Sequence, residues 1–241
     1  MLARALPACL SIAAALTLWE AYVRLSGVSP LVLPAPSRVV QQIAANRLLL
    51  WQNLLPTLRA TLLGFAVSIA TAFLLSVVLD FAPRLRRALF PVFVVSQTLP
   101  LVAIAPLMVL WFGFDLTPKI LLVALVDGYA STEGEIEALL RSMGASRAGV
   151  FRRARLPSAL PFFFAGLRIS VTYAVVAAIF AEYAGARAGI GIVILNAKNS
   201  FRPDLMLAAV AVSSALTLLL FGLVVALQRV ALGWQHAGSA R

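Results

Sequence analysis

The sequence predicts an all-α, polytopic membrane protein with about six transmembrane helices. Three observations carry this prediction: the composition, the long apolar runs and the placement of the arginines. Apolar residues make up 62% of the chain, charged residues 12%, and the mean hydropathy is +0.97, whereas a water-soluble domain is about half apolar. The basic residues that give the net charge of +11 lie between apolar runs, so they indicate the orientation of the chain in a bilayer and not nucleic-acid binding.

Five apolar stretches are long enough to cross a bilayer, because about 20 helical residues span a hydrocarbon layer of about 30 Å. They occupy residues 5–25, 54–80, 89–113, 159–184 and 205–230. The first continues past Glu20 without a small-residue cleavage site, which favours a retained helix over a signal peptide. A sixth run, residues 117–129, would extend only about 20 Å as a helix and is unusually short for a span.

Arginine clusters in short loops indicate the orientation, because positive side chains stay on the cytoplasmic side during insertion. The clusters are Arg84, Arg86, Arg87 and then Arg141, Arg147, Arg152, Arg153, Arg155. If both are cytoplasmic, an even number of crossings separates them, and the short run must complete the second crossing. We therefore expect six spans with both termini in the cytoplasm and a fourth span that is thin, tilted or partly re-entrant. A five-span chain would leave one cluster outside.

Between the first two spans, residues 29–37 contain three prolines, which exclude a continuous helix there. Ser37 is suited to cap the stretch that follows, residues 38–50, whose apolar residues share one face. This pattern predicts a short amphipathic helix on the outer side of the membrane. No repeat, low-complexity tract or separate soluble domain is visible in the sequence, so residues 1–241 are expected to form a single membrane domain.

The sequence does not predict an enzyme. The single cysteine, Cys9, and the single histidine, His236, leave almost no material for a disulfide, a metal site or a nucleophile paired with an imidazole. The sequence has no Gly-rich loop ending in Gly-Lys-Ser or Gly-Lys-Thr, so this chain is not expected to use ATP through that device. A membrane-embedded enzyme would need acids, His or Cys converging at membrane depth, and the sequence indicates no such cluster.

The basic segment 130–158 has the pattern of a helix, a break and a second helix. Acidic residues at its start complement the positive end of the first helix, Gly144 suits the turn that ends it, and Ser146 can cap the second. Pro157 then marks the re-entry into the membrane. The first helix also carries an apolar stripe. The segment around this stripe is too charged to be buried in lipid, so the stripe indicates a protein partner. The stripe consists of Leu139, Leu140 and Met143.

This segment resembles the signature of the permease subunits of bacterial ATP-binding-cassette (ABC) importers: Glu-Ala-Ala, three residues, Gly, nine residues, Ile, one residue, Leu-Pro. Gly144, Leu156 and Pro157 fall at the matching spacing, while Ala138 stands where the signature has its acid and Ala154 replaces the Ile. The resemblance implies a type I-like importer fold and a cytoplasmic coupling segment that docks into a groove on a separate ATPase. Its coupling residues would be Glu137, Ala138, Leu139, Leu140, Met143, Gly144, Ala145, Ser146, Leu156 and Pro157.

The resemblance extends over nearly the whole chain, including residues 33–37, 111–113 and 181–186. It is closest to the nitrate, sulfonate and taurine permease group and, within that group, to permeases for thiamine-precursor pyrimidines, on residues 139–146, 160–167 and 200–204. It implies a homodimer with two ATPase subunits inside and a soluble substrate-binding protein outside, and no cofactor on this chain. The alternative substrates are aliphatic sulfonates, taurine or nitrate.

The length of the fourth span bears on whether the chain can transport. Relatives carry a further apolar stretch with a proline between the positions that match Val126 and Asp127, so the fourth span is shortened here. The chain is then either a working short variant or a transport-impaired membrane scaffold.

Polar groups inside spans are costly and tend to face a pathway, which makes Gln97, Tyr173 and Glu182 candidates for lining it. Packing for Tyr173 and an interfacial position for Glu182 remain open alternatives.

Overall fold

The computed structural model describes residues 2–97, 143, 146–183 and 186–233, and these residues form helices without any strand. This confirms the all-α prediction for the described part of the chain. The helices are α1 (Leu2–Ser26), α2 (Pro36–Ala45), α3 (Arg47–Phe81), α4 (Pro83–Gln97), α8 (Arg147–Val150), the π-helical turn η1 (Phe151–Arg155), α9 (Leu156–Tyr183), α10 (Ile190–Asn199) and α11 (Pro203–Ala231).

Three helices of the described part are long and apolar enough to cross a membrane: Arg47–Phe81, Arg147–Tyr183 and Pro203–Ala231. They cover the predicted second, fifth and sixth spans. The first predicted span is a continuous helix of 25 residues, α1. The third is described only as far as Gln97, and the short fourth lies outside the described residues, so the number of six spans remains a prediction.

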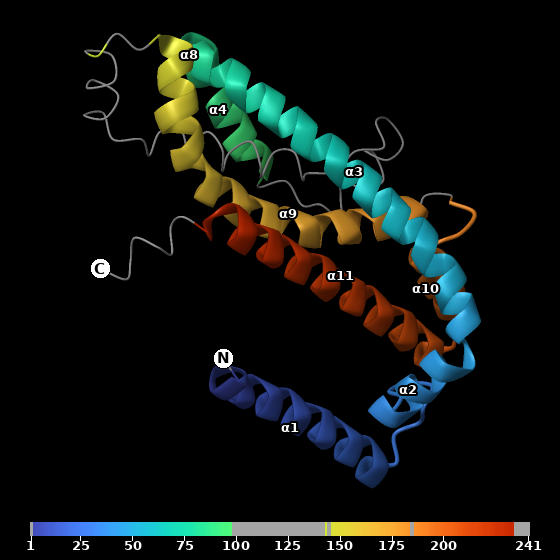
Figure 1. Cartoon of the computed structure of the whole chain (residues 1–241). Coiled ribbons are helices and arrows are strands. Elements are labelled where there is room, and N and C mark those ends of the chain that lie inside the picture. The colour runs from blue at the N-terminus through green and yellow to red at the C-terminus, as the bar shows by residue number, and fades with distance from the viewer. Residues whose placement is uncertain (1, 98–142, 144–145, 184–185, 234–241) are drawn as a thin grey trace.

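The long helices α3, α9 and α11 lie side by side (Figure 1). At one end, the end of α3 and the start of α4 meet α8 and η1; we call this the arginine end, after Arg84–Arg87 and Arg147–Arg155. At the opposite end, the start of α3 lies near α2, α10 and the start of α11; we call this the α10 end. The terminal ends of α1 and α11 both lie toward the side of the arginine end (Figure 1).

Small buried residues occur along both α3 and α9, which pack against each other. Membrane helices gain little from burying apolar surface against each other, so close backbone approach and van der Waals packing hold them together. The small buried residues of α3 are Thr57, Thr61, Ser68, Ala72 and Ser76. Those of α9 recur at intervals of four and are Gly166, Ser170, Ala174 and Ala178. Larger side chains of α3, α9 and α11 complete the core between the three helices.

The stretch after the first span differs from the prediction. The predicted helix 38–50 is divided at Asn46, since α2 ends at Ala45 and α3 begins at Arg47. Ser37 does not cap α2: its backbone N–H and its hydroxyl donate hydrogen bonds of 3.0 and 2.8 Å to the carboxylate of Glu20. A carboxylate at a helix N-terminus satisfies free N–H groups and meets the positive end of the helix dipole. Glu20 therefore ties α1 to α2.

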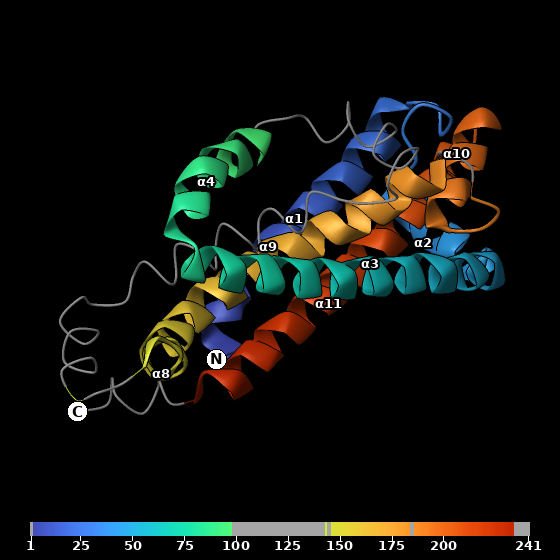
Figure 2. The same ribbon diagram turned by 90° about the horizontal axis from the view of Figure 1, so that it is seen from above.

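The helices α1 and α4 are the least embedded in the bundle. Among the described elements, α1 makes substantial contact only with α2, and most of its side chains are exposed. The helix α4 begins at Pro83, where a missing N–H costs nothing, and lies on the side of α3 away from α11 (Figure 2). The first arginine cluster was predicted to lie in a loop; it lies instead in the first turns of α4.

Candidate functional site

Only part of the predicted coupling segment lies within the described residues. Glu137, Ala138, Leu139, Leu140, Gly144 and Ala145 lie outside them. Met143 is described and is 74% exposed. Ser146 has extended backbone torsions, and its hydroxyl accepts a hydrogen bond of 3.2 Å from the backbone N–H of Gly149. Ser146 therefore caps α8, and this part of the helix–break–helix prediction is confirmed.

The second helix of the segment does not end at Pro157. The chain from Arg147 to Tyr183 is one continuous helix of 37 residues, and both Leu156 and Pro157 lie inside it. A proline in a helix removes one hydrogen bond, and its ring clashes with the carbonyl four residues before it. The wider π turn of η1 lies directly before Leu156 and absorbs this conflict without breaking the helix. The part of the basic segment that follows Ser146 is thus a direct extension of a membrane helix.

A buried ion pair joins this basic extension to the end of α3. The guanidinium of Arg155 lies 2.6 Å from a carboxylate oxygen of Asp80, whose side chain is 4% exposed. Beside this pair, the rings of Phe81, the residue after Asp80, and of Phe151, four residues before Arg155, lie with their centroids 5.5 Å apart. An ion pair with one such deeply buried partner holds the two helices together strongly, because separating the charges would leave a carboxylate unpaired.

The three predicted pathway residues lie in different surroundings. Gln97 is the last residue of α4, and its side chain is not among the described ones. Tyr173 lies midway along α9 and is 41% exposed, so its ring is available to lipid, to a pathway or to another chain. Glu182 lies at the end of α9 and is 5% exposed, so its carboxylate is buried among neighbouring helices. The structure therefore does not bring the three together, and their pathway role remains a prediction.

Glu182 lies at the centre of a hydrogen-bonded cluster at the α10 end. The hydroxyl of Thr57 in α3 donates to one carboxylate oxygen at 2.6 Å, and the backbone N–H of Gly191 donates to the other at 2.6 Å. The Thr57 oxygen in turn accepts from the N–H of Ile190 at 2.8 Å, and Asn53 accepts from the N–H of Gly189 at 2.9 Å. Three backbone N–H groups at the start of α10 are satisfied in this way by α3 and α9.

Glycines 189 and 191 make this cluster possible. Gly189 has a φ of 147°, and a Cβ atom there would collide with the carboxyl group of Glu182. A Cβ atom on Gly191 would lie 2.6 Å from the carbonyl oxygen of Ile179. The contact at Gly191 can be relieved only by moving backbone, and the φ of Gly189 lies in a region that favours glycine, so both positions require glycine. The sequence signal that could have found the cluster is the Gly-Ile-Gly repeat so close to an acid inside a span.

A second polar cluster fixes α2 to the start of α11. Asp204 is buried and accepts a hydrogen bond of 2.7 Å from the amide of Gln42, with Arg38 at 3.4 Å. Gln42 also accepts hydrogen bonds from Asn46 and Arg202. Among the described residues, no group of three or more His, Cys, Asp or Glu could hold a metal ion. These polar contacts therefore position helices.

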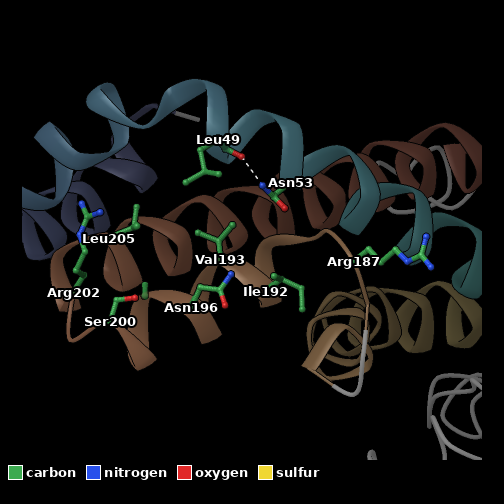
Figure 3. A pocket seen from close by; sticks show the side chains of 10 residues that line it. Leu49, Asn53, Arg187, Ile192, Val193, Asn196, Ser200, Arg202 and Leu205 are labelled. Atoms are coloured by element: carbon green, nitrogen blue, oxygen red, sulfur yellow. Dashed lines mark hydrogen bonds between the residues drawn. The ribbon is translucent and has the colours of Figure 1, made fainter.

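A cavity of about 270 Å³ opens beside these clusters at the α10 end. It lies between α3, α10 and the start of α11, and Figure 3 shows its lining residues. Leu49, Val193 and Leu205 contribute apolar surface to it, and Asn53, Asn196 and Ser200 contribute polar groups. Sequence reasoning did not predict α10 or this cavity, because the short run 190–199 is below the length of a span.

Residues 64–231 match the family described as binding-protein-dependent transport system inner membrane component. The chain is 34% identical to the formylaminopyrimidine transport permease protein ThiX of Halalkalibacterium halodurans, over 91% of this chain and 92% of that protein. It is 35% identical to the riboflavin transport system permease protein RibX of Chloroflexus aurantiacus (91% and 87% covered). It is 30% identical to the taurine transport system permease protein TauC of Escherichia coli (93% and 88% covered).

A similar fold occurs in an inward-facing structure of the MetNI methionine ABC transporter. The TM-score is 0.56 at 18% sequence identity, with 76% of this chain and 94% of that chain covered. At this identity the similarity concerns the fold alone.

Replacing Arg155 with Met is expected to lower the free energy of unfolding by about 2 kcal/mol, because Asp80 would be left buried and unpaired while Arg155 itself is partly exposed. The double variant Arg155→Met, Asp80→Asn should recover much of this loss. Thermal unfolding of the detergent-purified chain measures both. Arg153→Met, at an exposed position, is the matched control and should change little. Equal losses from Arg155→Met and from the control would contradict the role given to the pair.

Gly191→Ala is expected to destabilise the chain by about 1–3 kcal/mol, the usual cost of overpacking, because its Cβ atom would press on the backbone of α9. The same unfolding measurement tests it. Gly64→Ala is the control, since a Cβ atom there has nothing within 4 Å. A Gly191→Ala chain as stable as the Gly64→Ala chain would show that the Glu182 cluster is looser than its hydrogen bonds indicate.

Proposed function

The chain belongs to the family of binding-protein-dependent transport system inner membrane components, the permease subunits of ABC importers, and from this premise we propose that it forms a homodimeric import pathway for a thiamine-precursor pyrimidine. As a permease it is a multi-pass membrane subunit and not an enzyme, and a separate subunit hydrolyses ATP. One observation carries the proposal beyond the family match: Arg155 and Asp80 fix the basic extension of a membrane helix to α3.

We place the arginine end in the cytoplasm. The first predicted cytoplasmic cluster lies there on the first turns of α4, and the described part of the second, Arg147–Arg155, lies there on α8 and η1. Because positive side chains resist translocation, this orientation follows from their position. It puts both chain termini in the cytoplasm, since α1 and α11 have their terminal ends toward that side (Figure 1). The α10 end then faces the outside, where a substrate-binding protein delivers solute.

The coupling segment, residues 130–158, would dock on the ATPase at the arginine end. Glu137 to Ser146 would form the docking surface, and Leu156 and Pro157 lie where the segment continues into the membrane helix. Closure of the two ATPase subunits would push on this segment. The continuous helix that follows is about 55 Å long and is attached to α3 at both ends, so the push would tilt the pair and change access at the far end.

The homodimer is the assembly that the family resemblance implies. In it α1, a helix of 25 residues that has substantial contact only with α2 among the described elements, would be free to pack against the second copy of the chain. In a dimer, Tyr173 and Gln97 are our candidates for lining the pathway, and Glu182 would position the helices around it rather than bind solute, because its oxygens are already engaged.

The substrate proposal rests on the solutes for which the relatives are named. Two of them carry nitrogen heterocycles, a formylaminopyrimidine and riboflavin, and others carry taurine and aliphatic sulfonates. We favour the pyrimidine because the resemblance in residues 139–146, 160–167 and 200–204 points the same way. A sulfonate importer is the second candidate, and a transport-impaired scaffold is the third because of the short fourth span.

Gly144→Trp, or deletion of residues 137–146, is expected to abolish co-elution of the ATPase during purification of the intact complex, because either change removes the docking surface. Gly233→Leu is the matched control, since this glycine lies just after α11 with nothing within 4 Å of its Cβ position. The ratio of the two subunits on a stained gel measures the effect. Normal ATPase retention by the Gly144→Trp chain would disprove docking through this segment.

Cys9 allows a direct test of the dimer, because it is the single cysteine of the chain and is exposed on α1. A photoreactive maleimide attached to Cys9 is expected to yield an adduct of twice the chain mass of 25.7 kDa after illumination in nanodiscs that hold one complex each. Cys9→Ser should give no adduct. If the labelled chain remains at monomer mass while other subunits co-purify, the homodimer proposal is wrong.

Cells that express the chain with its ATPase and binding protein are expected to accumulate labelled formylaminopyrimidine and not labelled taurine. A chain with Glu137 to Ser146 deleted gives the background. Accumulation of taurine alone would favour the sulfonate class, and accumulation of labelled riboflavin would shift the class to larger heterocycles. Uptake of none of the three by a complex that retains its ATPase would favour the scaffold.

A further inference from the structure

The rim of the cavity at the α10 end carries positive charge without a matching acid. Arg187, before α10, and Arg202, after it, both line the cavity and both are exposed. No acidic residue lines it. The acids of this end among the described residues are engaged elsewhere: Glu20 with Ser37 and Arg24, Glu182 with Thr57 and Gly191, and Asp204 with Gln42 and Arg38.

These arginines lie on the side where positive charge is disfavoured. In the orientation proposed above, the loop before α10 and the turn after it are external, and arginine is depleted from short external loops because it hinders insertion. Arg187 has no ionic partner within the described residues, and Arg202 has only a hydrogen bond of 3.3 Å to the amide of Gln42. Within the part of the chain that the structure describes, neither charge forms an ion pair.

A strained aromatic residue lies directly beside the cavity. Phe201 follows Ser200 and precedes Arg202 in the turn between α10 and α11, and its side chain is 81% exposed. Its φ of 51° lies in the left-handed region, which a bulky side chain adopts only at a cost in energy. Folding gains nothing from holding a phenylalanine exposed in this conformation. Exposed aromatic and arginine side chains together are typical of protein interfaces.

We propose that this surface, formed by Arg187, Phe201 and Arg202 around the cavity, is the docking site for an acidic surface of the soluble substrate-binding protein; the proposal rests on the function proposed above. Figure 3 shows the two arginines at opposite ends of the cavity, with Val193 and Asn196 between them. Two cations so far apart match two separated carboxylates on a protein better than one small anion. The apolar side chains of Leu49, Val193 and Leu205 give the cavity a lining that suits an apolar side chain of the partner.

The test measures ATPase stimulation of the complete importer, in nanodiscs of neutral lipid, by increasing amounts of its purified binding protein. Arg187→Gln with Arg202→Gln is expected to raise the half-saturating concentration of binding protein about tenfold and to remove most of its dependence on salt, since rim charges act on association and are screened. The activity at saturation should remain, because both residues lie at the end opposite the arginine end. Arg47→Gln is the control: it is exposed at the same end but does not line the cavity.

Phe201→Asn separates docking from folding. Asparagine tolerates the left-handed conformation, so this variant should be at least as stable as the unmodified chain and yet need several times more binding protein for half-stimulation. Half-saturating concentrations within twofold of the unmodified complex for both variants would overturn the proposal. So would a defect that appears only when the nanodiscs contain anionic lipid, because the arginines would then bind headgroups. An unmodified complex that its binding protein never stimulates would instead contradict the proposed function.

Discussion

The pairing of α3 with α9 is the interaction on which the rest of the structure depends. Two helices in a bilayer cannot be driven together by water, so they need close contact and polar contacts that lipid cannot replace. Here both helices carry small buried residues, which allow close approach of the neighbouring helices. Polar contacts hold the two ends, Asp80 with Arg155 at one and Thr57 with Glu182 at the other.

The two end contacts have different structural roles. At the arginine end, the ion pair makes the basic extension and α3 one unit, so a force on the extension reaches both helices. At the α10 end, the Glu182 cluster holds the start of α10, and α10 in turn forms one wall of the cavity. The same helix pair thus connects the surface proposed to meet the ATPase with the surface proposed to meet the binding protein.

The sequence predicted the elements that depend on local or one-dimensional properties. The apolar runs that became α1, α3, α9 and α11 were recognisable by length, and the cap at Ser146 followed from a hydroxyl before a helix. The capping of α2 was mispredicted, because the group that binds its N-terminus, Glu20, comes from another helix. The π turn was not predicted either. A proline such as Pro157 carries the same sequence signal whether the helix is interrupted there or continues with a π turn before it. The partners in the two end contacts lie 75 and 125 residues apart in the sequence, and no spacing rule connects them.

The π turn also has a consequence for the comparison of related chains. A π turn contains one residue more than an α-helical turn, and that residue rotates the following part of the helix by about 100° relative to an uninterrupted helix. Arg155 faces Asp80 while Arg152 and Arg153 remain exposed on the same short turn. A homologue lacking one residue between positions 150 and 156 could keep α8 and α9 in place with a regular helix. A single-residue gap in an alignment at this point would therefore mark a change of helix type and not the loss of a contact.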